Sequence, residues 1–283
     1  MEATILSATE LRRLATAIRL RAVAMVAPQG LGYLGQALSA AEQYAAVYGA
    51  ALRPGTDRVV CSPAHYVIAA YAAAARTGLL DEAMLETYGQ DGSALEAIGT
   101  ERSPVPDYTC GSLGQGLSAA AGFALGDRLA GRDDTRTFAF LSDGELQEGQ
   151  VWEAAMFAGH HRLAQLTVLL DANNSQVDGP VDTITTIEPV GAKWRAFGWD
   201  AVELDGHDVD AVAAALAGGT DGTDGAGTAA DQARPRILVC RTSTRHGLAC
   251  LPPDADGHFV KLPADLAAAA EAELSAELAS YER

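Results

Sequence analysis

The chain has 283 residues, of which 48% are apolar, and carries a formal net charge of −17 at pH 7. Its length suits one large α/β unit, and its acidic charge argues against nucleic acid and anionic membrane as partners, because both favour proteins rich in Lys and Arg. Four cysteines without CxxC spacing, no signal-peptide pattern and no apolar run of transmembrane length predict a cytoplasmic protein without a disulfide framework.

Helical periodicity dominates the first half of the chain. Helices are predicted over residues 10–27, 38–51, 63–77, 81–88 and 114–130. Pro63 suits a first helical turn, and Thr77-Gly78 suits a helix end. The stretch 89–113 is rich in Gly, Pro and Ser and predicts irregular structure.

Strands and helices alternate from residue 137 onward. Strands are predicted at 137–142, 166–171, 199–204 and 237–241, with helices between them at 150–162, 188–197 and 208–217. A strand–helix–strand crossover requires parallel pairing and a right-handed connection. The pattern therefore predicts an α/β fold: a doubly wound, mostly parallel sheet with helices on both faces, in a single domain spanning 1–283. We expect 218–234 to be a mobile surface loop and the C-terminal segment 264–283 to form an alanine-rich helix over 264–281.

Polar residues follow two neighbouring predicted strands. Asp143 and Gly144 follow the first strand, and Asn173 and Ser175 follow the second, about one crossover unit later. Ligands bind at the carboxyl edge of such sheets, and a carboxylate, an amide oxygen and a loop carbonyl suit Mg²⁺ held jointly with phosphate oxygens. Gly144 leaves room for a phosphate to approach the backbone. The alternative is an ordinary Asp-Gly turn beside an Asn-rich loop, and the paired Asn at crossover spacing disfavours it.

Several segments resemble transketolases, in the same order along the chain. They are LSAAE at 38–42, SPAHY at 62–66, GSLGQGLSAAAGFAL at 111–125, SDGELQEGQVWEAAMFAGHHRL at 142–163, LLDANNSQVDGP at 169–180, KWRAFGW at 193–199 and DGHD at 205–208. This ordered set is similar to the N-terminal, thiamine-diphosphate-binding half of transketolases and covers roughly residues 10–262. The resemblance implies thiamine diphosphate and Mg²⁺ as cofactors.

The resemblance also implies roles for individual residues. Asp143 and Asn173 would be the side-chain ligands of Mg²⁺, with the Ser175 carbonyl as a third ligand. Gly144 would contact the diphosphate, and His65 would hydrogen-bond the diphosphate or the bound substrate. The other expected cofactor-binding residues lie in the same motifs and the tail: Gly111 and Leu113 beside the pyrimidine, Ser112, Glu145 and His258.

Two acidic and two histidine positions have further implied roles. Glu148 and Glu153 match acidic residues that the family places in a proton network between subunits. The alternative interpretation is that both residues lie in the solvent-exposed first turn of a helix, a position that favours acidic residues in any case. His258 matches a phosphate-side histidine after the last strand, and His246 is a rival for that position.

Tyr33 marks a departure from the family pattern. The family's GHPGG loop, which supplies a histidine to the reacting carbonyl, corresponds here to GYLGQ at 32–36. A phenol donates a hydrogen bond but carries protons poorly at neutral pH, because its pKa is near 10. A second family histidine has no counterpart in 95–102, and Ser142 precedes Asp143 where the family has glycine. The loss of the two histidines counts against the standard sugar-phosphate pair and leaves an unusual ketose or a non-sugar acyl compound as alternatives, whereas Ser142 adds only one hydroxymethyl group. The expected catalytic residues are Tyr33, His65, Glu148 and Glu153.

In transketolases the glutamate that activates the cofactor lies in a second, pyrimidine-binding domain. We expect that domain on a separate chain, a C-terminal transketolase-like subunit, most simply in a heterotetramer. The expected activity is transfer of a two-carbon ketol or acyl unit from a ketose or related donor to an aldehyde or related acceptor. The alternative is a non-catalytic scaffold or regulatory paralogue, which Tyr33 favours and the intact Asp143 and Asn173 disfavour. A nucleotide-binding fold is disfavoured because no GxGxxG motif follows a first predicted strand and no GxxxxGK[ST] loop is present.

Overall fold

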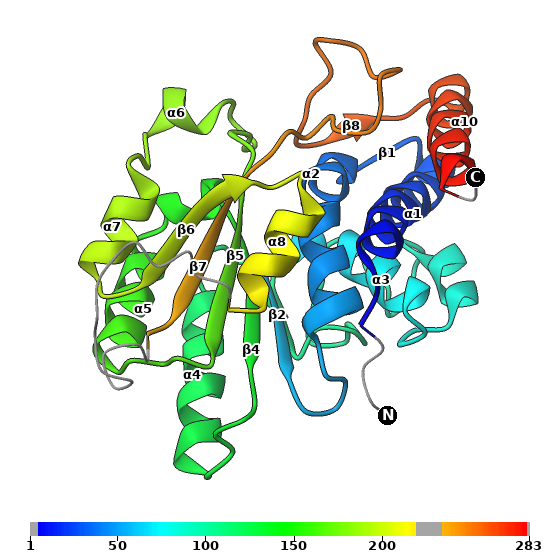
Figure 1. The fold of residues 1–283 in the computed structure, drawn as a ribbon. Coiled ribbons are helices and arrows are strands. Elements are labelled where there is room, and N and C mark those ends of the chain that lie inside the picture. Colours follow the sequence, from blue (N-terminus) through cyan, green and yellow to red (C-terminus); the bar gives the residue numbers. More distant parts are fainter. Residues whose placement is uncertain (1–4, 219–233, 282–283) are drawn as a thin grey trace.

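A six-stranded sheet forms the centre of the protein. The computed structural model describes residues 5–218 and 234–281. Every neighbouring pair of strands in this sheet is parallel, and the strand order is β3-β2-β4-β5-β7-β6. The strands are β2 (Arg58–Pro63), β3 (Tyr108–Cys110), β4 (Thr137–Ser142), β5 (Leu166–Ala172), β6 (Asp200–Asp205) and β7 (Arg236–Arg241). Their carboxyl ends point to the top of Figure 1, so residues that follow the strands gather at that edge.

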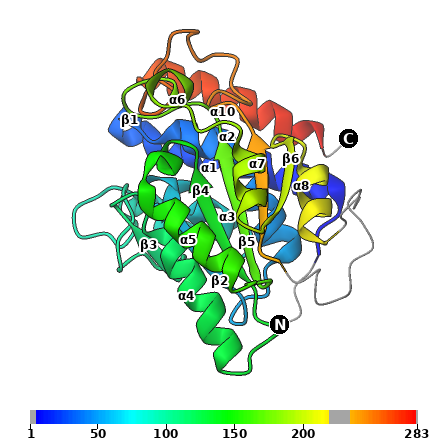
Figure 2. The same ribbon diagram turned by 90° about the vertical axis from the view of Figure 1, so that its left-hand side faces the viewer.

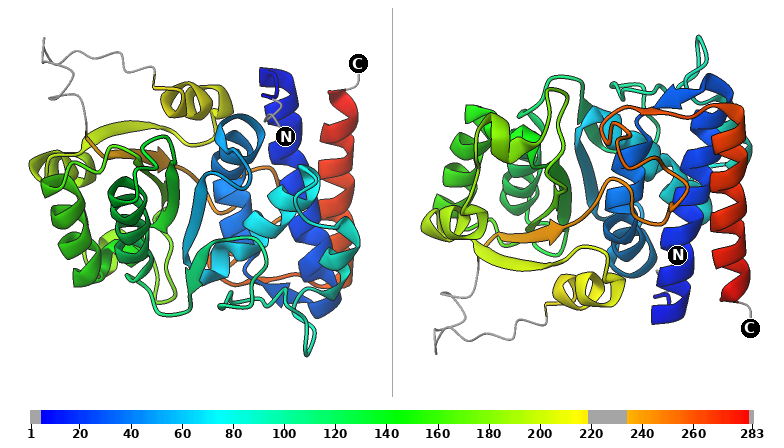
Figure 3. Two further views of the ribbon diagram at one scale, coloured as in Figure 1. Left: turned by 90° about the horizontal axis from the view of Figure 1, so that it is seen from below. Right: turned by 90° about the horizontal axis from the view of Figure 1, so that it is seen from above.

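Helices cover both faces of the sheet, which confirms the doubly wound α/β fold (Figures 1 and 3). One face packs on α2 (Leu34–Ala46), α3 (Val67–Arg76) and α8 (Val209–Leu216), with α1 (Ala8–Val26) and α10 (Ala264–Ser280) outside them. The other face packs on α4 (Gly116–Leu129), α5 (Gly149–His160) and α7 (Val190–Ala196), and the short α6 (Val181–Ile184) lies above the carboxyl edge. Shorter helical turns are η1 (Ala27–Gln29), η2 (Val47–Ala51), η3 (Ala64–Tyr66), η4 (Glu82–Thr87) and η5 (Gly144–Gln147). Within the described ranges, no helix is both long and apolar enough to cross a membrane.

The central strands are apolar on both faces because both faces are buried. In β4, Phe138 and Phe140 pack with the helices of one face, and Ala139 and Leu141 pack with those of the other. The ring of Phe140 stacks on that of Tyr44 in α2, with ring centroids 3.8 Å apart. A run of six buried residues at 137–142 is typical of a central parallel strand and explains why this strand was predicted with its observed bounds.

A small antiparallel ribbon joins an early and a late segment of the chain above the sheet. It pairs β1 (Leu31–Gly32) with β8 (Val260–Lys261), both labelled in Figure 1, and Figure 2 shows β1 near α10. Tyr33 directly follows β1, and His258 lies two residues before β8. The ribbon therefore places two predicted site residues, 225 positions apart in the sequence, on the same side of the molecule.

The predicted sheet was too small. The sequence placed its first strand at 137–142, but β2 and β3 precede it, and β2 lies between β3 and β4. The sequence predicted a helix from residue 63, whereas β2 extends to Pro63 and the α-helix begins at Val67. β3 is a three-residue edge strand inside the stretch predicted to be irregular. The predicted loop 218–234 lies outside the described residues, apart from its two end positions.

Ion pairs join the segments at the opposite, amino end of the strands. Asp57 is buried before β2, and its carboxylate accepts hydrogen bonds from the guanidinium groups of Arg53 and Arg136 at 2.6 and 2.7 Å. Arg136 directly precedes β4, and its main-chain amide also donates to Asp57. One buried carboxylate thus ties the loop after η2 to the starts of two adjacent strands.

Candidate active site

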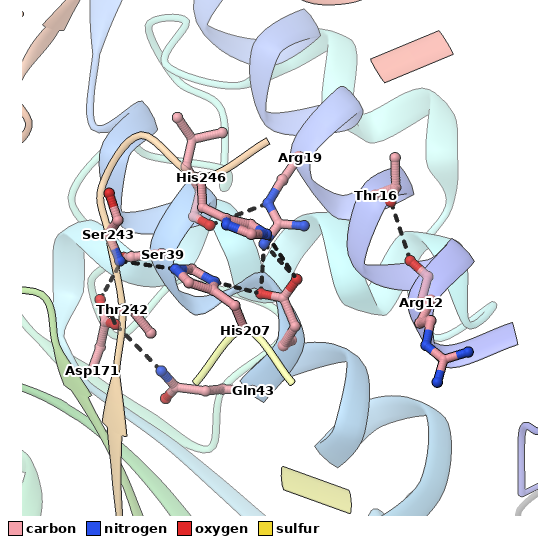
Figure 4. Close-up of polar contacts among 12 residues, drawn as sticks. Arg12, Thr16, Arg19, Ser39, Gln43, Asp171, His207, Thr242, Ser243 and His246 are labelled. Atoms are coloured by element: carbon pink, nitrogen blue, oxygen red, sulfur yellow. Dashed lines mark hydrogen bonds and ion pairs between the residues drawn. The ribbon is translucent and has the colours of Figure 1, made fainter. Parts of the chain in front are cut away.

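Asp171 is the central polar residue at the carboxyl edge of the sheet. It is the penultimate residue of β5, with 1% of its surface exposed. Its two carboxylate oxygens accept hydrogen bonds from five side chains on four elements or loops, some of which Figure 4 shows: Ser39 (2.5 Å), Gln43 (3.3 Å), Tyr66 (2.8 Å), Asn173 (2.6 Å) and Thr242 (2.5 Å). Asp171 therefore connects α2, η3 and the ends of β5 and β7.

Asn173 is oriented by this network. Its Nδ2 group donates to Asp171 and, at 3.0 Å, to the hydroxyl of Tyr66, so the nitrogen faces the protein interior. Its Oδ1 atom lies on the other side of the amide and accepts from the Ser175 main-chain amide at 2.9 Å. An amide oxygen has two lone pairs, so Oδ1 retains capacity for one more partner.

Asp143 holds the loop after β4 to the loop after β5. One carboxylate oxygen accepts from the main-chain amide of Gly144 at 2.8 Å, and the other accepts from that of Asn174. Asn174 has φ +57°, a left-handed conformation that asparagine tolerates better than most residues. The side chain of Asp143 is 3% exposed, and burial together with the nearby Asp171 carboxylate raises the pKa of Asp143 to about 7.

The donor set at this edge fits a hard divalent cation with a bound phosphate. In the described part of the chain no arginine or lysine forms an ion pair with Asp143 or Asp171, although the two carboxylates repel each other. A cation beside Asp143 would offset that repulsion. A carboxylate, the oriented Oδ1 of Asn173 and loop carbonyls are the oxygen ligands that Mg²⁺ takes when it also binds phosphate.

Glu145, in η5, is buried at the same carboxyl edge of the sheet, on the side of β2. Its Oε1 accepts from the Ser62 hydroxyl at 2.5 Å and from the Gly114 main-chain amide at 2.7 Å, and burial raises the pKa of Glu145 to about 7. Glu145 thereby links η5 to β2 and to the 111–114 loop. Within that loop Gly111 and Ser112 are exposed and Leu113 is half-buried. The predicted pyrimidine contacts thus lie at the surface, and the structure places Glu145 behind them.

Tyr33, His65 and His258 form one aromatic cluster. The ring of His65 lies 5.1 Å from that of Tyr33 and 5.0 Å from that of His258, measured between centroids. Burial and the neighbouring His258 lower the pKa of His65 to about 3, so His65 is neutral at physiological pH. His65 directly precedes Tyr66, which bonds to Asp171, so this cluster adjoins the polar network of the sheet edge.

His246 lies in a different cluster. Its ring stacks on that of His207 with centroids 3.6 Å apart, beside the buried ion pair between Arg19 and Glu42 (Figure 4). Nδ1 of His207 lies 3.3 Å from the Glu42 carboxylate, and its Nε2 accepts from the Ser243 main-chain amide at 2.9 Å. Of the two rival histidines, the structure therefore brings His258, and not His246, to His65.

The Glu42, His207 and His246 side chains do not form a convincing metal site, although their potential ligand atoms lie within 4.8 Å of one another. A metal ion lies in the plane of each imidazole that binds it, and two rings stacked at 9° and 3.6 Å cannot both meet that condition. Both nitrogens of His207 already have partners, and Arg19 already neutralises Glu42. The cluster instead joins α1 to α2 and to the segment after β7.

Glu148 and Glu153 lie on the outer side of α5 and its N-terminal end. Both are exposed in the single chain. A Cβ on Gly114 would lie 2.9 Å from the Cβ of Glu148, so Glu148 packs against the 111–114 loop. The structure thus groups Glu148 with the predicted pyrimidine contacts and separates it from the Tyr33 cluster.

The family is identified by its sequence model. The model for the thiamine diphosphate binding domain of transketolase matches residues 11–279. The chain belongs to the transketolase family. Its relatives include the transketolase-family protein y4mO of Sinorhizobium fredii, 38% identical over 87% of this chain and 88% of that one. The 6-deoxy-6-sulfo-D-fructose transketolase subunit SqwG of a Clostridium species is 35% identical over 95% of this chain and 97% of its own. An apulose-4-phosphate transketolase subunit of Phocaeicola vulgatus is 30% identical over 69% of this chain and 72% of its own.

Solved transketolases share the fold. The transketolase of Campylobacter jejuni has a TM-score of 0.77 at 21% identity and aligns with 96% of this chain and 48% of that one. The Pichia stipitis transketolase in complex with sedoheptulose-7-phosphate has a TM-score of 0.77 at 27% identity, over 98% of this chain and 45% of that one. The chain therefore spans about half the length of these transketolases.

Several residues that position the site were not among those predicted from the sequence. Asp171 stood at the end of a predicted strand, and Ser39 and Tyr66 stood in segments that carry the family resemblance, yet none was predicted to belong to the site. A buried polar residue ending an otherwise apolar strand was the available signal for Asp171. No sequence pattern indicated Gln36, whose amide reaches His258.

Proposed function

We propose that this chain is one subunit of a transketolase-like transferase that depends on thiamine diphosphate and Mg²⁺. It would transfer a two-carbon ketol or acyl unit from a ketose or related donor to an aldehyde or related acceptor. The observation that carries the proposal is the hydrogen bond from the Asn174 amide to Asp143, which holds the loops after β4 and β5 together inside the family-matched domain. Asp143, Asn173 and the Ser175 carbonyl would bind Mg²⁺, and Gly144 would contact the diphosphate.

The aromatic cluster would bind the reacting end of the substrate. The carbanion chemistry is supplied by thiamine diphosphate when bound. Tyr33 can donate a hydrogen bond to a carbonyl or hydroxyl oxygen, while neutral His65 can accept or donate one. The low pKa of His65 means that it would orient polar groups without placing a positive charge beside them.

A second subunit would complete the site. We propose a C-terminal transketolase-like partner that carries the pyrimidine-binding domain, in a heterotetramer, with residues 1–283 forming the single diphosphate-binding domain. Relatives of matching length are named as subunits, which supports this proposal. Exposed apolar side chains on α4 and α5 also support it, because Leu129, Met156 and Phe157 are 78%, 56% and 42% exposed. Glu148 and Glu153 lie near the same surface and would reach the interface.

Cofactor titration of the assembled pair tests the proposal. Thiamine diphosphate is added to this chain, with and without Mg²⁺ and with and without the C-terminal partner, and binding is followed by calorimetry. We expect binding to require both additions and to weaken roughly 100-fold or more in Asp143→Ala, because a metal ligand is lost. Asp182→Ala is the matched control, since Asp182 is exposed on the neighbouring α6. Cofactor binding without Mg²⁺ would refute the proposed metal site. No cofactor binding by the assembled pair, or no transfer from any donor in a screen of ketoses and acyl compounds, would instead indicate a non-catalytic scaffold.

A further inference from the structure

Gln36, in the first turn of α2, contacts the loop of residues 254–259 that precedes β8. The Nε2 atom of Gln36 lies 2.9 Å from the main-chain oxygen of His258 and 3.2 Å from Nδ1 of the same residue. A main-chain oxygen only accepts hydrogen bonds, so the amide nitrogen of Gln36 must face His258. The glutamine is 2% exposed, so this contact is shielded from water.

This contact determines which nitrogen of His258 carries the proton. A neutral imidazole has one donor nitrogen and one acceptor nitrogen. Nδ1 faces a donor and must accept, so the proton of neutral His258 is on Nε2. Burial lowers the pKa of His258, which favours the neutral ring. His258 therefore offers a hydrogen-bond donor within the cluster that contains Tyr33 and His65.

The backbone around Gln36 allows the 254–259 loop to lie directly on α2. A Cβ on Gly35 would lie 1.9 Å from the carbonyl oxygen of Gly257, so only glycine permits this approach. Within the loop, the Asp256 carboxylate accepts from the main-chain amides of His258 at 2.8 Å and Phe259 at 3.3 Å. The loop is thus rigid at its tip, and Gln36 is the side chain that bonds it to α2.

Packing alone does not explain a glutamine at this position. Its Oε1 atom is buried and has no hydrogen-bond partner within the described residues. A buried acceptor without a partner destabilises the folded state, and such groups are rare unless they have a specific role. An apolar side chain of similar size would avoid this loss but could not bond His258.

We propose that Gln36 is a positioning residue that bonds the 254–259 loop to α2 and holds His258 with its proton on Nε2, ready to donate to an oxygen of the substrate. The acceptor would be a carbonyl, hydroxyl, phosphate or sulfonate oxygen, since all of these accept from a neutral imidazole. The substrate role rests on the proposed function, whereas the loop contact and the proton position do not.

Nitrogen NMR of the full chain tests the proton position without any activity. The chain is labelled with ¹⁵N-histidine, and long-range ¹H–¹⁵N correlations are recorded at pH 7.5, with His258 assigned from its loss in His258→Asn. We expect His258 to be protonated on Nε2 in the unmodified chain. His207 is the control in the same spectrum, because its Nε2 accepts from Ser243 and its proton must be on Nδ1.

Two variants of Gln36 should change His258 in different ways. Gln36→Glu presents a carboxylate to Nδ1 and should move the proton to that atom, whereas Gln36→Leu should give a mixture of both forms. Hydrogen exchange at 255–259 should become faster in Gln36→Leu because the loop loses its bond to α2. A proton on Nδ1 in the unmodified chain, or an unchanged His258 in both variants, would overturn the proposal.

Kinetics of the assembled pair test the substrate role separately. Gln36→Leu should raise KM roughly tenfold, the equivalent of one lost hydrogen bond of about 1.4 kcal/mol, with a much smaller change in kcat. A changed His258 proton position with an unchanged KM would refute the substrate role. If the pair transfers no ketol unit, the proposed function fails, while the NMR result still decides whether Gln36 positions His258.

Discussion

Replacing Asp171 with alanine should strongly destabilise the protein. The substitution removes the acceptor shared by Ser39, Tyr66, Asn173 and Thr242, whose donor atoms lie 2.5 to 2.8 Å from the carboxylate. Ser39 and Tyr66 would remain buried without this partner, and Asn173 and Thr242 would remain partly buried, at the meeting point of α2, η3, β5 and β7. Because they come from separate elements, no local rearrangement replaces the lost acceptor for all of them.

The expected loss in the free energy of unfolding is about 3–5 kcal/mol. A buried donor that loses its partner costs about 1–3 kcal/mol, and part of the total is offset because a buried negative charge is also removed. Asp171→Asn should cost less, about 1–2 kcal/mol. The three hydroxyl groups can rotate to accept from the new amide, and the buried Oε1 of Gln43, which has no partner in the described structure, can also accept from it.

Urea unfolding followed by tryptophan fluorescence measures these differences. Asp254→Ala is the control, because Asp254 is exposed in the 254–259 loop and its loss should change stability by less than about 0.5 kcal/mol. The reasoning is refuted if Asp171→Ala loses less than about 1 kcal/mol. It is also refuted if Asp171→Asn is as destabilised as Asp171→Ala. Asparagine has the shape of aspartate, and the neighbouring hydroxyl groups can rotate to bond its amide, so equal losses would mean that these hydrogen bonds contribute nothing.

Two further predictions concern Glu145 and Gly35. The raised pKa of Glu145, about 7, means that its stabilising contribution is fully present below about pH 4 and is lost as the pH rises through 7. In Mg²⁺-free buffer, Glu145→Gln should therefore flatten the pH dependence of unfolding and be more stable than the unmodified chain at pH 8 by roughly 1–3 kcal/mol; an unchanged pH profile would contradict this. Gly35→Ala should lose about 1–3 kcal/mol in thermal or urea unfolding, because its Cβ would overlap the Gly257 carbonyl. Gly122→Ala is the control, since nothing lies near that Cβ and alanine favours a helix, and equal effects of the two alanine substitutions would reject the overlap argument.

The central strands could be predicted from the sequence, but the first edge of the sheet could not. β4 and β5 are apolar over most of their length because both of their faces are buried, and such short apolar runs between helical segments are typical of central parallel strands. β2 has only three consecutive apolar residues and ends in Ser62-Pro63, which also suits the start of a helix. Its place in the sheet depends on pairing with β4, a contact that local sequence does not encode.

The part of the candidate site that could be predicted from the sequence consists of polar residues directly after the ends of strands. Asp143 and Asn173 were predicted together because parallel strands bring their carboxyl ends to one edge, and in the structure Asp143 bonds the loop that carries Asn173. Asp171 and Gln36 were not found, because their importance depends on which side chains from distant elements face them. The same limit applied to His246 and His258: both lie in polar loops, and only the β1–β8 ribbon distinguishes them.

The Asp57 ion pairs have a practical consequence for anyone modifying this protein. They join the loop after η2 to β2 and β4 at the amino end of the strands, opposite the loops that follow β4 and β5. Attachment points for a resin, a fluorophore or a cross-linker can therefore be introduced at the exposed residues 54–56. The surrounding ion pairs would hold the attachment point in place, and the carboxyl edge of the sheet would stay accessible to solution.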